Sequence, residues 1–370
     1  MDRSPPFWPP ARNGRKASPA GVILISFTSA MFGSAPADDN WTVQTSGTTA
    51  RLRGVSVASP RVVWASGTQG TVLRTIDGGT SWRKWTVSGA SSLDFRDIHA
   101  LDERTAFVLS IGAGELSRIY KTADGGENWE LRYKNQDPKG FLDAFAFWDA
   151  DHGIALGDPV EGRFAILTTD DRGKTWDRIP AEKVPPALAG EGAFAASGTC
   201  LTLQGGANVW IGTGGASVAR VYRSTDRGRT WTVHDTPIRA GNPSSGIFSL
   251  AFQDSEHGVA VGGDYKQPDQ SGRFVASTTD GGRTWTVPHE TCPAGYRSAV
   301  AYAAGPGQST LVAVGPTGTD LSSDDGKTWR SLGKLGFHAV GFAGQTGAGW
   351  AVGEDGLIAK FRTAPAVIHR

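Results

Sequence analysis

The chain has 370 residues, with 37 Lys and Arg against 36 Asp and Glu, and a formal net charge of +1. A chain this close to neutrality offers no electrostatic case for binding nucleic acid or an anionic membrane surface. Its 50 glycines, 13 tryptophans and many short runs of β-branched and aromatic residues instead indicate an all-β protein with a large buried surface.

The first 37 residues differ from the rest. Arg12, Arg15 and Lys16 precede an apolar run over residues 20–32, and small residues follow up to Ala37. A basic segment, a short apolar segment and small residues, in this order, are typical of a secretory signal peptide. We therefore predict cleavage near Ala37 and a mature protein that lies in the periplasm or outside the cell, with no membrane span. A retained N-terminal anchor is the alternative.

One short motif, [S/T]-x-D-x-G-x-[T/S/N]-W, occurs six times, and its tryptophans recur at intervals of 44 to 55 residues. A period of this length indicates a propeller or a solenoid. No GH…WD pattern accompanies it, which excludes a WD40 array. We call the six copies the repeat turns, and their aspartates and tryptophans are Asp77 and Trp82, Asp124 and Trp129, Asp171 and Trp176, Asp226 and Trp231, Asp280 and Trp285, and Asp324 and Trp329.

Each repeat turn lies between two β-type runs, as with residues 72–75 and 82–87, and so predicts a hairpin. The aspartate can accept backbone N–H groups of its own turn, and the second glycine can adopt a positive φ. The tryptophan can cover the junction between neighbouring repeats. We interpret all three roles as structural, and expect loss of stability when the aspartate or tryptophan is replaced.

Two further strands precede each repeat turn. In the second repeat they cover residues 95–100 and 106–110, and in the third repeat residues 142–147 and 153–156. Four strands per repeat in an up-and-down order form a propeller blade.

The two ends of the chain complete each other. Three strands between Phe337 and Phe361 lack a fourth, and Trp41–Thr45 resembles the strand after each repeat turn although no such turn precedes it. The predicted fold is an all-β, seven-bladed propeller of four-stranded antiparallel blades, in which the N-terminal strand closes the last blade. Residues 38–370 form this single domain, which we expect to be a monomer; six and eight blades are the alternatives.

An up-and-down meander sorts its loops onto two faces. The repeat turns share one face, and the long connections 181–197 and 262–272 belong to the other, which is the expected binding face. The starts of the innermost strands align at the mouth of the axis on this second face, and only the fourth blade aligns poorly. The aligned residues are Arg53, Arg96, Asp143, Phe248, Arg297 and His338.

Several guanidinium groups in one concavity favour an anionic ligand, so we expect this axial mouth to bind an acidic segment of a partner protein. The alternative is that these side chains pair with each other or with carbonyl groups along the axis.

Two loops on the same face share a Gly-Asp…Gly-Arg-Phe pattern, with Asp158 and Arg163 in one and Asp264 and Arg273 in the other; Tyr265 follows Asp264. Asp–Arg pairs within each loop would fix its shape, and we favour this reading over catalysis.

The remaining chemistry is sparse. Cys200 and Cys292 either form a disulfide or remain two separate thiols, because sequence does not give the Cα separation that a bridge requires. The histidines lack the spacing of metal ligands, and no nucleotide-binding or nucleophile motif occurs in a suitable context. We therefore expect no metal and no cofactor.

The repeat turn is similar to the Asp box, or bacterial neuraminidase repeat. Residues 41–361 resemble the photosystem II stability/assembly factor family, with the likeness carried by stretches such as 254–262 and 349–353 ahead of the repeat turns. This resemblance implies a seven-bladed propeller that assists assembly of other proteins and is not known for catalysis. It implies a protein partner in the cell envelope.

Two other function classes share the motif. Sialidases and glucan hydrolases carry Asp boxes, and so do sortilin-type receptors, so a glycoside hydrolase and a ligand-binding receptor remain alternatives. A hydrolase needs two facing carboxylates, for which Asp143, Asp158 and Asp264 are the candidates.

Overall fold

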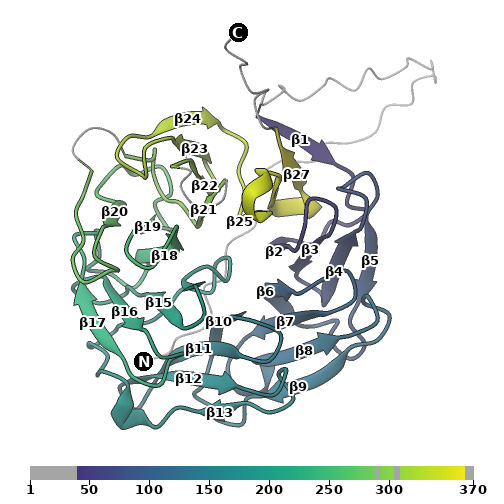
Figure 1. Ribbon diagram of the computed structural model, residues 1–370, viewed down its shortest axis with the longest axis horizontal. Coiled ribbons are helices and arrows are strands. Elements are labelled where there is room, and N and C mark those ends of the chain that lie inside the picture. Colours follow the sequence, from purple (N-terminus) through teal and green to yellow (C-terminus); the bar gives the residue numbers. More distant parts are fainter. Residues whose placement is uncertain (1–39, 289–291, 304–308, 363–370) are drawn as a thin grey trace, which may run out of the picture. The chain divides into compact units, whose positions relative to one another are not determined.

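The computed structural model describes residues 40–288, 292–303 and 309–362. The predicted signal peptide lies outside these residues. Seven antiparallel sheets are arranged in a ring, with the innermost strand of each at the axis (Figure 1). The predicted seven-bladed propeller is therefore confirmed. No helix in the described part of the chain is long and apolar enough to cross a bilayer.

The blades follow one another along the chain. Blade 1 contains β2 (Leu52–Val57), β3 (Val63–Gly67), β4 (Thr71–Thr75) and β5 (Arg83–Thr86). Blade 2 contains β6 (Asp94–Ala100), β7 (Ala106–Ile111), β8 (Arg118–Thr122) and β9 (Glu130–Lys134). Blade 3 contains β10 (Leu142–Phe147), β11 (Gly153–Val160), β12 (Arg163–Thr169) and β13 (Asp177–Arg178). Blades 4 and 5 contain β14 (Leu201–Gln204), β15 (Asn208–Gly212), β16 (Arg220–Ser224) and β17 (Thr232–Asp235); and β18 (Ser245–Phe252), β19 (Gly258–Asp264) and β20 (Val275–Thr278).

Blades 6 and 7 contain β21 (Ala299–Tyr302), β22 (Leu311–Gly315), β23 (Gly318–Ser322) and β24 (Arg330–Gly333); and β25 (Ala339–Phe342), β26 (Gly349–Val352), β27 (Ile358–Phe361) and β1 (Trp41–Gln44). Four short 3₁₀ turns lie in loops: Gly114–Leu116, Ala181–Lys183, Gly344–Thr346 and Glu354–Gly356. Blade 5 differs from the others, because an isolated bridge between Ser277 and Thr286 stands in place of a full fourth strand.

The N-terminal strand closes the ring as predicted. β1 pairs antiparallel with β27, from Trp41 opposite Phe361 to Gln44 opposite Ile358, and so becomes the outermost strand of blade 7 (Figure 1). Trp41 is 3% exposed and packs in the core between blades 6 and 7. This pairing joins the two ends of the described chain and leaves no blade without a neighbour.

The hydrophobic core lies between the blades. Seven clusters of buried side chains, counted over the described residues, each combine residues of two adjacent blades. Each repeat-turn tryptophan packs on the cluster that its blade shares with the preceding blade, which is the predicted junction role. Trp231, Trp285 and Trp329 are at most 8% exposed, whereas the other three are half-buried.

Candidate functional site at the axial mouth

Four of the six ring residues predicted from the sequence occupy equivalent positions. In blades 1, 2, 3 and 5 the register between the two innermost strands shifts by one residue, and the skipped residues are Arg53, Arg96, Asp143 and Phe248. A β-bulge leaves one residue outside the ladder and re-aims its side chain. The local backbone therefore turns these four side chains toward the axis.

Two of the predicted ring residues contact acidic groups of their own blades. Arg297 donates its Nε–H to Asp320 Oδ2 over 2.6 Å, and both side chains are at most 3% exposed. His338 Nε2 lies 2.8 Å from Glu354 Oε1. For these two residues, pairing within the protein replaces the predicted role at an open anion site.

Arg53 is the exception. Its side chain is buried, with 6% of the residue exposed, and its Nε has no hydrogen-bond partner in the described structure. Burial, reinforced by the positive charge of Arg96, lowers the pKa of Arg53 to about 9, against the opposing influence of Asp94. A buried guanidinium without a hydrogen-bonded counter-charge is energetically costly.

Arg96 stands beside Arg53 with part of its donor capacity engaged. Its Nε donates to Asp94 Oδ2 over 2.8 Å and one Nη donates to the carbonyl of Ala195 over 3.0 Å. The carboxylate of Asp94 offsets one of the two guanidinium charges, and the pair keeps a net positive charge. The tyrosine hydroxyl of Tyr296 comes close enough to both arginines to feel their charge.

The mouth is not open to the channel beneath it. Residues 193–199, which we call the plug, cross the axis between blades. The Ser197 hydroxyl donates to the carbonyl of Ser298 in blade 6 over 2.9 Å, and Thr199 bonds Ser249 of blade 5 over 2.7 Å. The last residues of the 181–197 connection, together with Thr199, bond to blades 2, 5 and 6 and close the mouth toward the channel.

An anchor that sequence reading missed holds the plug in place. The carboxylate of Glu191 is buried and accepts hydrogen bonds from Arg220 Nε at 3.0 Å, from the Thr213 hydroxyl at 2.6 Å and from the Leu188 N–H at 2.8 Å. Because all the acceptor positions face donors, the segment that leads into the plug is fixed to blade 4.

One wall of the mouth is aromatic. Phe194 of the plug stacks on Phe248 with ring centroids 3.9 Å apart, Tyr296 meets Phe248 edge-on at 4.7 Å, and Tyr265 packs against the same cluster. The ring alignment singled out Phe248, but the other aromatic residues come from three different loops. No local spacing in the sequence connects them.

The predicted Asp–Arg pairs within the loops do not form, so this prediction is wrong. Asp158 accepts the N–H of Ala193 at 3.1 Å, whereas Arg163 donates to the carbonyl of Val184. Asp264 accepts Nδ2 of Asn242 at 3.1 Å and the N–H of Lys266 at 2.9 Å, and Arg273 is exposed. In both loops the carboxylate is bonded by a donor of another segment, 35 residues away for Asp158 and 22 residues away for Asp264, instead of by the arginine of its own loop.

Asp143 and Asp158 are electrostatically coupled. Burial and the neighbouring negative charge of Asp158 raise the pKa of Asp143 well above its usual range, and Asp143 Oδ2 has no hydrogen-bond partner within the described residues. Asp143 is 1% exposed. Its carboxyl group is therefore shielded from solvent.

The disulfide alternative is excluded, because both cysteines are free thiols. Cys200 belongs to the core between blades 3 and 4, and Cys292 packs on the core between blades 5 and 6. Burial raises the pKa of the Cys200 thiol well above its usual value.

The repeat turns satisfy their polar groups internally. In the fourth copy, Asp226 accepts the N–H of Thr230 at 2.9 Å and its hydroxyl at 2.6 Å, and the Ser224 hydroxyl at 2.7 Å; Gly228 has φ +78°. The same contacts recur in the other five copies. Hydrogen bonds to the carboxylates lower the pKa of Asp124 and Asp171 to about 2. These aspartates hold their own hairpins.

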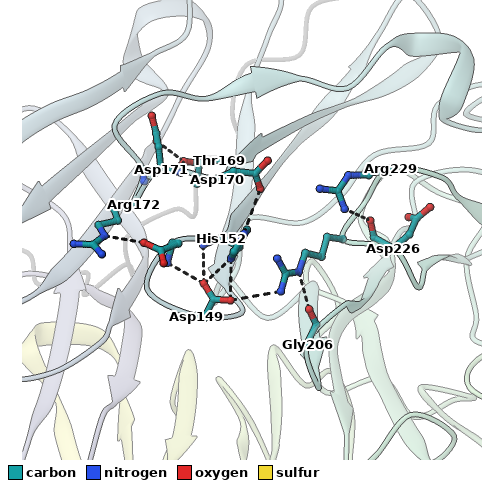
Figure 2. A network of polar contacts seen from close by, with 12 residues as sticks. Asp149, His152, Thr169, Asp170, Asp171, Arg172, Gly206, Asp226 and Arg229 are labelled. Atoms are coloured by element: carbon teal, nitrogen blue, oxygen red, sulfur yellow. Dashed lines mark hydrogen bonds and ion pairs between the residues drawn. The ribbon is translucent and has the colours of Figure 1, made fainter.

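Contacts between turns link the blades on the repeat-turn face. His152 Nδ1 lies 2.8 Å from Asp149 Oδ1, and Arg172 donates to Asp151 Oδ1 at 2.7 Å (Figure 2). Arg227 of blade 4 lies 3.6 Å from Asp149 of blade 3. This network is exposed and joins the tips of loops, so we interpret its role as structural.

A second concavity, of about 330 Å³, opens at the other end of the axis and is lined by the far halves of the inner strands. His99 faces it and contacts the ring of Phe147 at 5.5 Å between centroids. Burial lowers the pKa of His99 to about 4. Across residues 40–288, 292–303 and 309–362, no group of three or more His, Cys, Asp or Glu side chains is placed to hold a metal ion.

The pKa of His99 predicts a contribution to acid sensitivity. His99 is protonated near pH 6.5 in the unfolded chain but only near pH 4 in the folded protein. The stability that the neutral imidazole contributes to the folded state is therefore fully present above pH 6.5 and is lost as the pH falls toward 4. A His99→Gln variant should lose less unfolding free energy than the native protein between pH 7 and pH 4. Urea unfolding at four pH values measures this; parallel pH curves for the two proteins would contradict it.

Comparisons with known proteins extend only to the fold. No protein-family model and no curated protein matches the sequence. A structure of YCF48 bound to a D1 peptide is 18% identical, with a TM-score of 0.62 over 88% of this chain and 97% of that chain. YCF48 from Cyanidioschyzon merolae is 18% identical, with a TM-score of 0.63 over 87% and 99%.

A GH74 xyloglucanase from Xanthomonas campestris is 17% identical, with a TM-score of 0.59 over 86% of this chain and 53% of that chain, so this chain spans about half of the xyloglucanase. Propellers with different activities thus share this architecture. The described chain is a seven-bladed β-propeller similar in fold to YCF48, in agreement with the resemblance read from its sequence.

Proposed function

We propose that the protein is a non-catalytic interaction propeller whose axial mouth binds an acidic segment of a partner protein. The observation that carries this proposal is the buried guanidinium of Arg53, which has no hydrogen-bond partner within the described residues and lies next to Arg96. A carboxylate placed between the two would supply the missing counter-charge and accept charge-assisted hydrogen bonds.

The opposite wall of the mouth suits a peptide. Tyr265 and Tyr296 offer apolar ring faces with polar tips, as do many protein-binding surfaces. The fold is also that of YCF48, one structure of which contains a D1 peptide. The proposal keeps the protein in the cell envelope through the N-terminal signal peptide expected from residues 1–37.

A short acidic peptide tests the proposal. Replacing Arg53 by Gln should weaken binding of a fluorescent tetraglutamate about ten- to a hundredfold, because a charge-assisted hydrogen bond contributes about 1.5–3 kcal/mol. Arg96→Gln should weaken it in the same direction. Fluorescence anisotropy at two salt concentrations measures the affinity.

Arg229→Gln is the matched control, because Arg229 is exposed on the repeat-turn face and its substitution removes the same charge. Near-UV circular dichroism confirms that each variant is folded. Equal affinity of the Arg53→Gln variant and the native protein would refute the mouth as the site. Arg297 is unsuitable for this test, because its substitution would break the buried pair with Asp320.

A glycoside hydrolase is the second candidate, and one observation favours it. The carboxyl groups of Asp143 and Asp158 are coupled, and their environments raise the pKa of Asp143, as in acid/base pairs of hydrolases. The plug argues against a hydrolase, because the Ala193 N–H already donates a hydrogen bond to Asp158 and because Asp143 is buried. Hydrolysis of xyloglucan or a sialoside that is abolished by Asp143→Asn would establish this alternative.

A further inference from the structure

Two loops on the mouth face are joined into one rim. The connection from β17 to β18 (236–244) and the loop from β19 to β20 (265–274) are held together by backbone hydrogen bonds from the Arg239 N–H to the Arg273 carbonyl at 2.9 Å and from the Tyr265 N–H to the Ser244 carbonyl at 3.3 Å. These contacts fix the spacing of the side chains along the rim.

A groove of about 540 Å³ lies at the outer end of this rim. Its lining consists of Arg239, Arg273, Pro237, Ala240 and Gly272, and so contains two basic side chains and no acidic one. Both arginines are exposed, and neither has an ion-pair partner among the residues that the structure describes. Two like charges are therefore held side by side by the backbone without a neutralising group.

Exposed arginines of the propeller differ in their pairing, and some, such as Arg104 and Arg229, also have no ion-pair partner among the described residues. Arg83, by contrast, pairs with Glu127 of the next blade at 2.6 Å, and Arg172 pairs with Asp151 at 2.7 Å. Arg239 and Arg273 are distinguished by the backbone hydrogen bond that joins them and by the single groove that both of them line. The guanidinium fork suits a carboxylate or a phosphate.

The rim connects this groove to the axial mouth. Tyr265, at the inner end, packs on Phe248 with ring centroids 6.2 Å apart and belongs to the aromatic wall of the mouth. A chain segment leaving the mouth past Tyr265 can follow the rim outward to Arg239. The apolar floor of Pro237 and Ala240 leaves room for backbone and small side chains between the charged positions.

We infer that the groove between Arg239 and Arg273 binds a second acidic group of the same extended partner segment whose first acidic group enters the mouth. This inference rests on the proposed function and specifies its partner: a peptide with acidic residues at two separated positions. Strands spaced by about 4.8 Å place the outer strand of a four-stranded blade about 15 Å from its inner strand. An extended tetrapeptide spans about 13 Å and a dodecapeptide about 40 Å, so only the longer one bridges both sites.

The test compares tetraglutamate with dodecaglutamate. The native protein should bind the dodecapeptide at least about tenfold more tightly, because the second contact becomes intramolecular. The double variant Arg239→Gln/Arg273→Gln should lose this advantage while its affinity for tetraglutamate stays unchanged. The control Arg229→Gln/Arg283→Gln removes the same charge from exposed positions on the repeat-turn face. This control should still bind dodecaglutamate more tightly than tetraglutamate. A full length advantage in the Arg239→Gln/Arg273→Gln variant would overturn the inference.

A spectroscopic measurement separates this site from the mouth. In an Arg53→Gln/Arg96→Gln background, dodecaglutamate should still shift the Nε–Hε NMR signals of Arg239 and Arg273. If these signals shift but the native protein does not bind tetraglutamate, the groove remains a binding site and the mouth is refuted as one. If the signals do not shift, the groove is refuted as a binding site. Displacement of the dodecapeptide by an equal concentration of inorganic phosphate would overturn the assignment to an acidic peptide in favour of a phosphate ligand.

Discussion

Replacing Trp231 by alanine should lower the free energy of unfolding by about 3–5 kcal/mol, since truncating a buried aromatic residue leaves a cavity. Trp231 is 8% exposed, lies in the core between blades 3 and 4, and donates its indole N–H to the carbonyl of Gly228 at 2.8 Å. The cavity would open at an interface between two blades, where no neighbouring strand can move in to fill it. Urea unfolding followed by tryptophan fluorescence and circular dichroism measures the loss.

Two controls divide this effect into its parts. Trp231→Phe keeps most of the packing and loses the hydrogen bond, so it should cost about 1 kcal/mol beyond the smaller ring. Trp176→Ala removes an equivalent tryptophan that is half-buried and has no partner for its indole N–H in the described structure, and should cost less. Equal stability losses for Trp176→Ala and Trp231→Ala would contradict the role assigned to burial.

The aspartates of the repeat turns should act through the same hairpins. Asp226→Ala removes the acceptor for the Thr230 N–H and hydroxyl and for the Ser224 hydroxyl, and should lower the melting temperature. Loss of binding to a ligand or metal at an unchanged melting temperature would show that this turn is functional instead.

Glu191→Ala should produce the second large loss of stability, about 3–5 kcal/mol, because it leaves the charge of Arg220 buried without its carboxylate. Glu191 is 3% exposed and Arg220 is 8% exposed, and no water can replace the lost contacts without opening the segment. The double variant Glu191→Leu/Arg220→Met should recover part of the loss, since an apolar pair of similar volume does not require charge compensation.

Labelling of Cys200 distinguishes a loosened plug from global unfolding. Cys200 follows the plug and is fully buried, so in a Cys292→Ser background it should be protected in the native protein. In Glu191→Ala, Cys200 should react with a thiol reagent faster than urea unfolding predicts. Reaction rates that follow only the global unfolding free energy would show that Glu191 stabilises the whole domain and does not anchor the plug.

The seven-bladed ring can be predicted from local patterns in the sequence. Six repeat turns give the blade period, and an unpaired strand at each end predicts closure through β1 and β27. The sequence also located Arg53, Arg96, Asp143 and Phe248 as equivalent, because each is the residue that the inner-strand bulge places outside the ladder. These features depend on local chain geometry, which repeats whenever the local pattern repeats.

Which polar groups at the mouth have hydrogen-bond or ion-pair partners could not be predicted from the sequence and is seen only in the folded protein. Arg297 meets Asp320 and His338 meets Glu354 across hairpins within their blades, whereas Arg53 meets no such acid. The plug and its anchor at Glu191 come from one long connection, and the aromatic wall is assembled from segments far apart in the chain.

The physical reason is that charge pairing and loop packing depend on distances between segments far apart in the chain. Ser197 bonds Ser298 across the axis, and Cys200 and Cys292 end in different interfaces although both are in the same domain. A repeat fixes each blade from its own residues, but the axis is shared by all seven blades. What fills it is therefore set only when the ring closes.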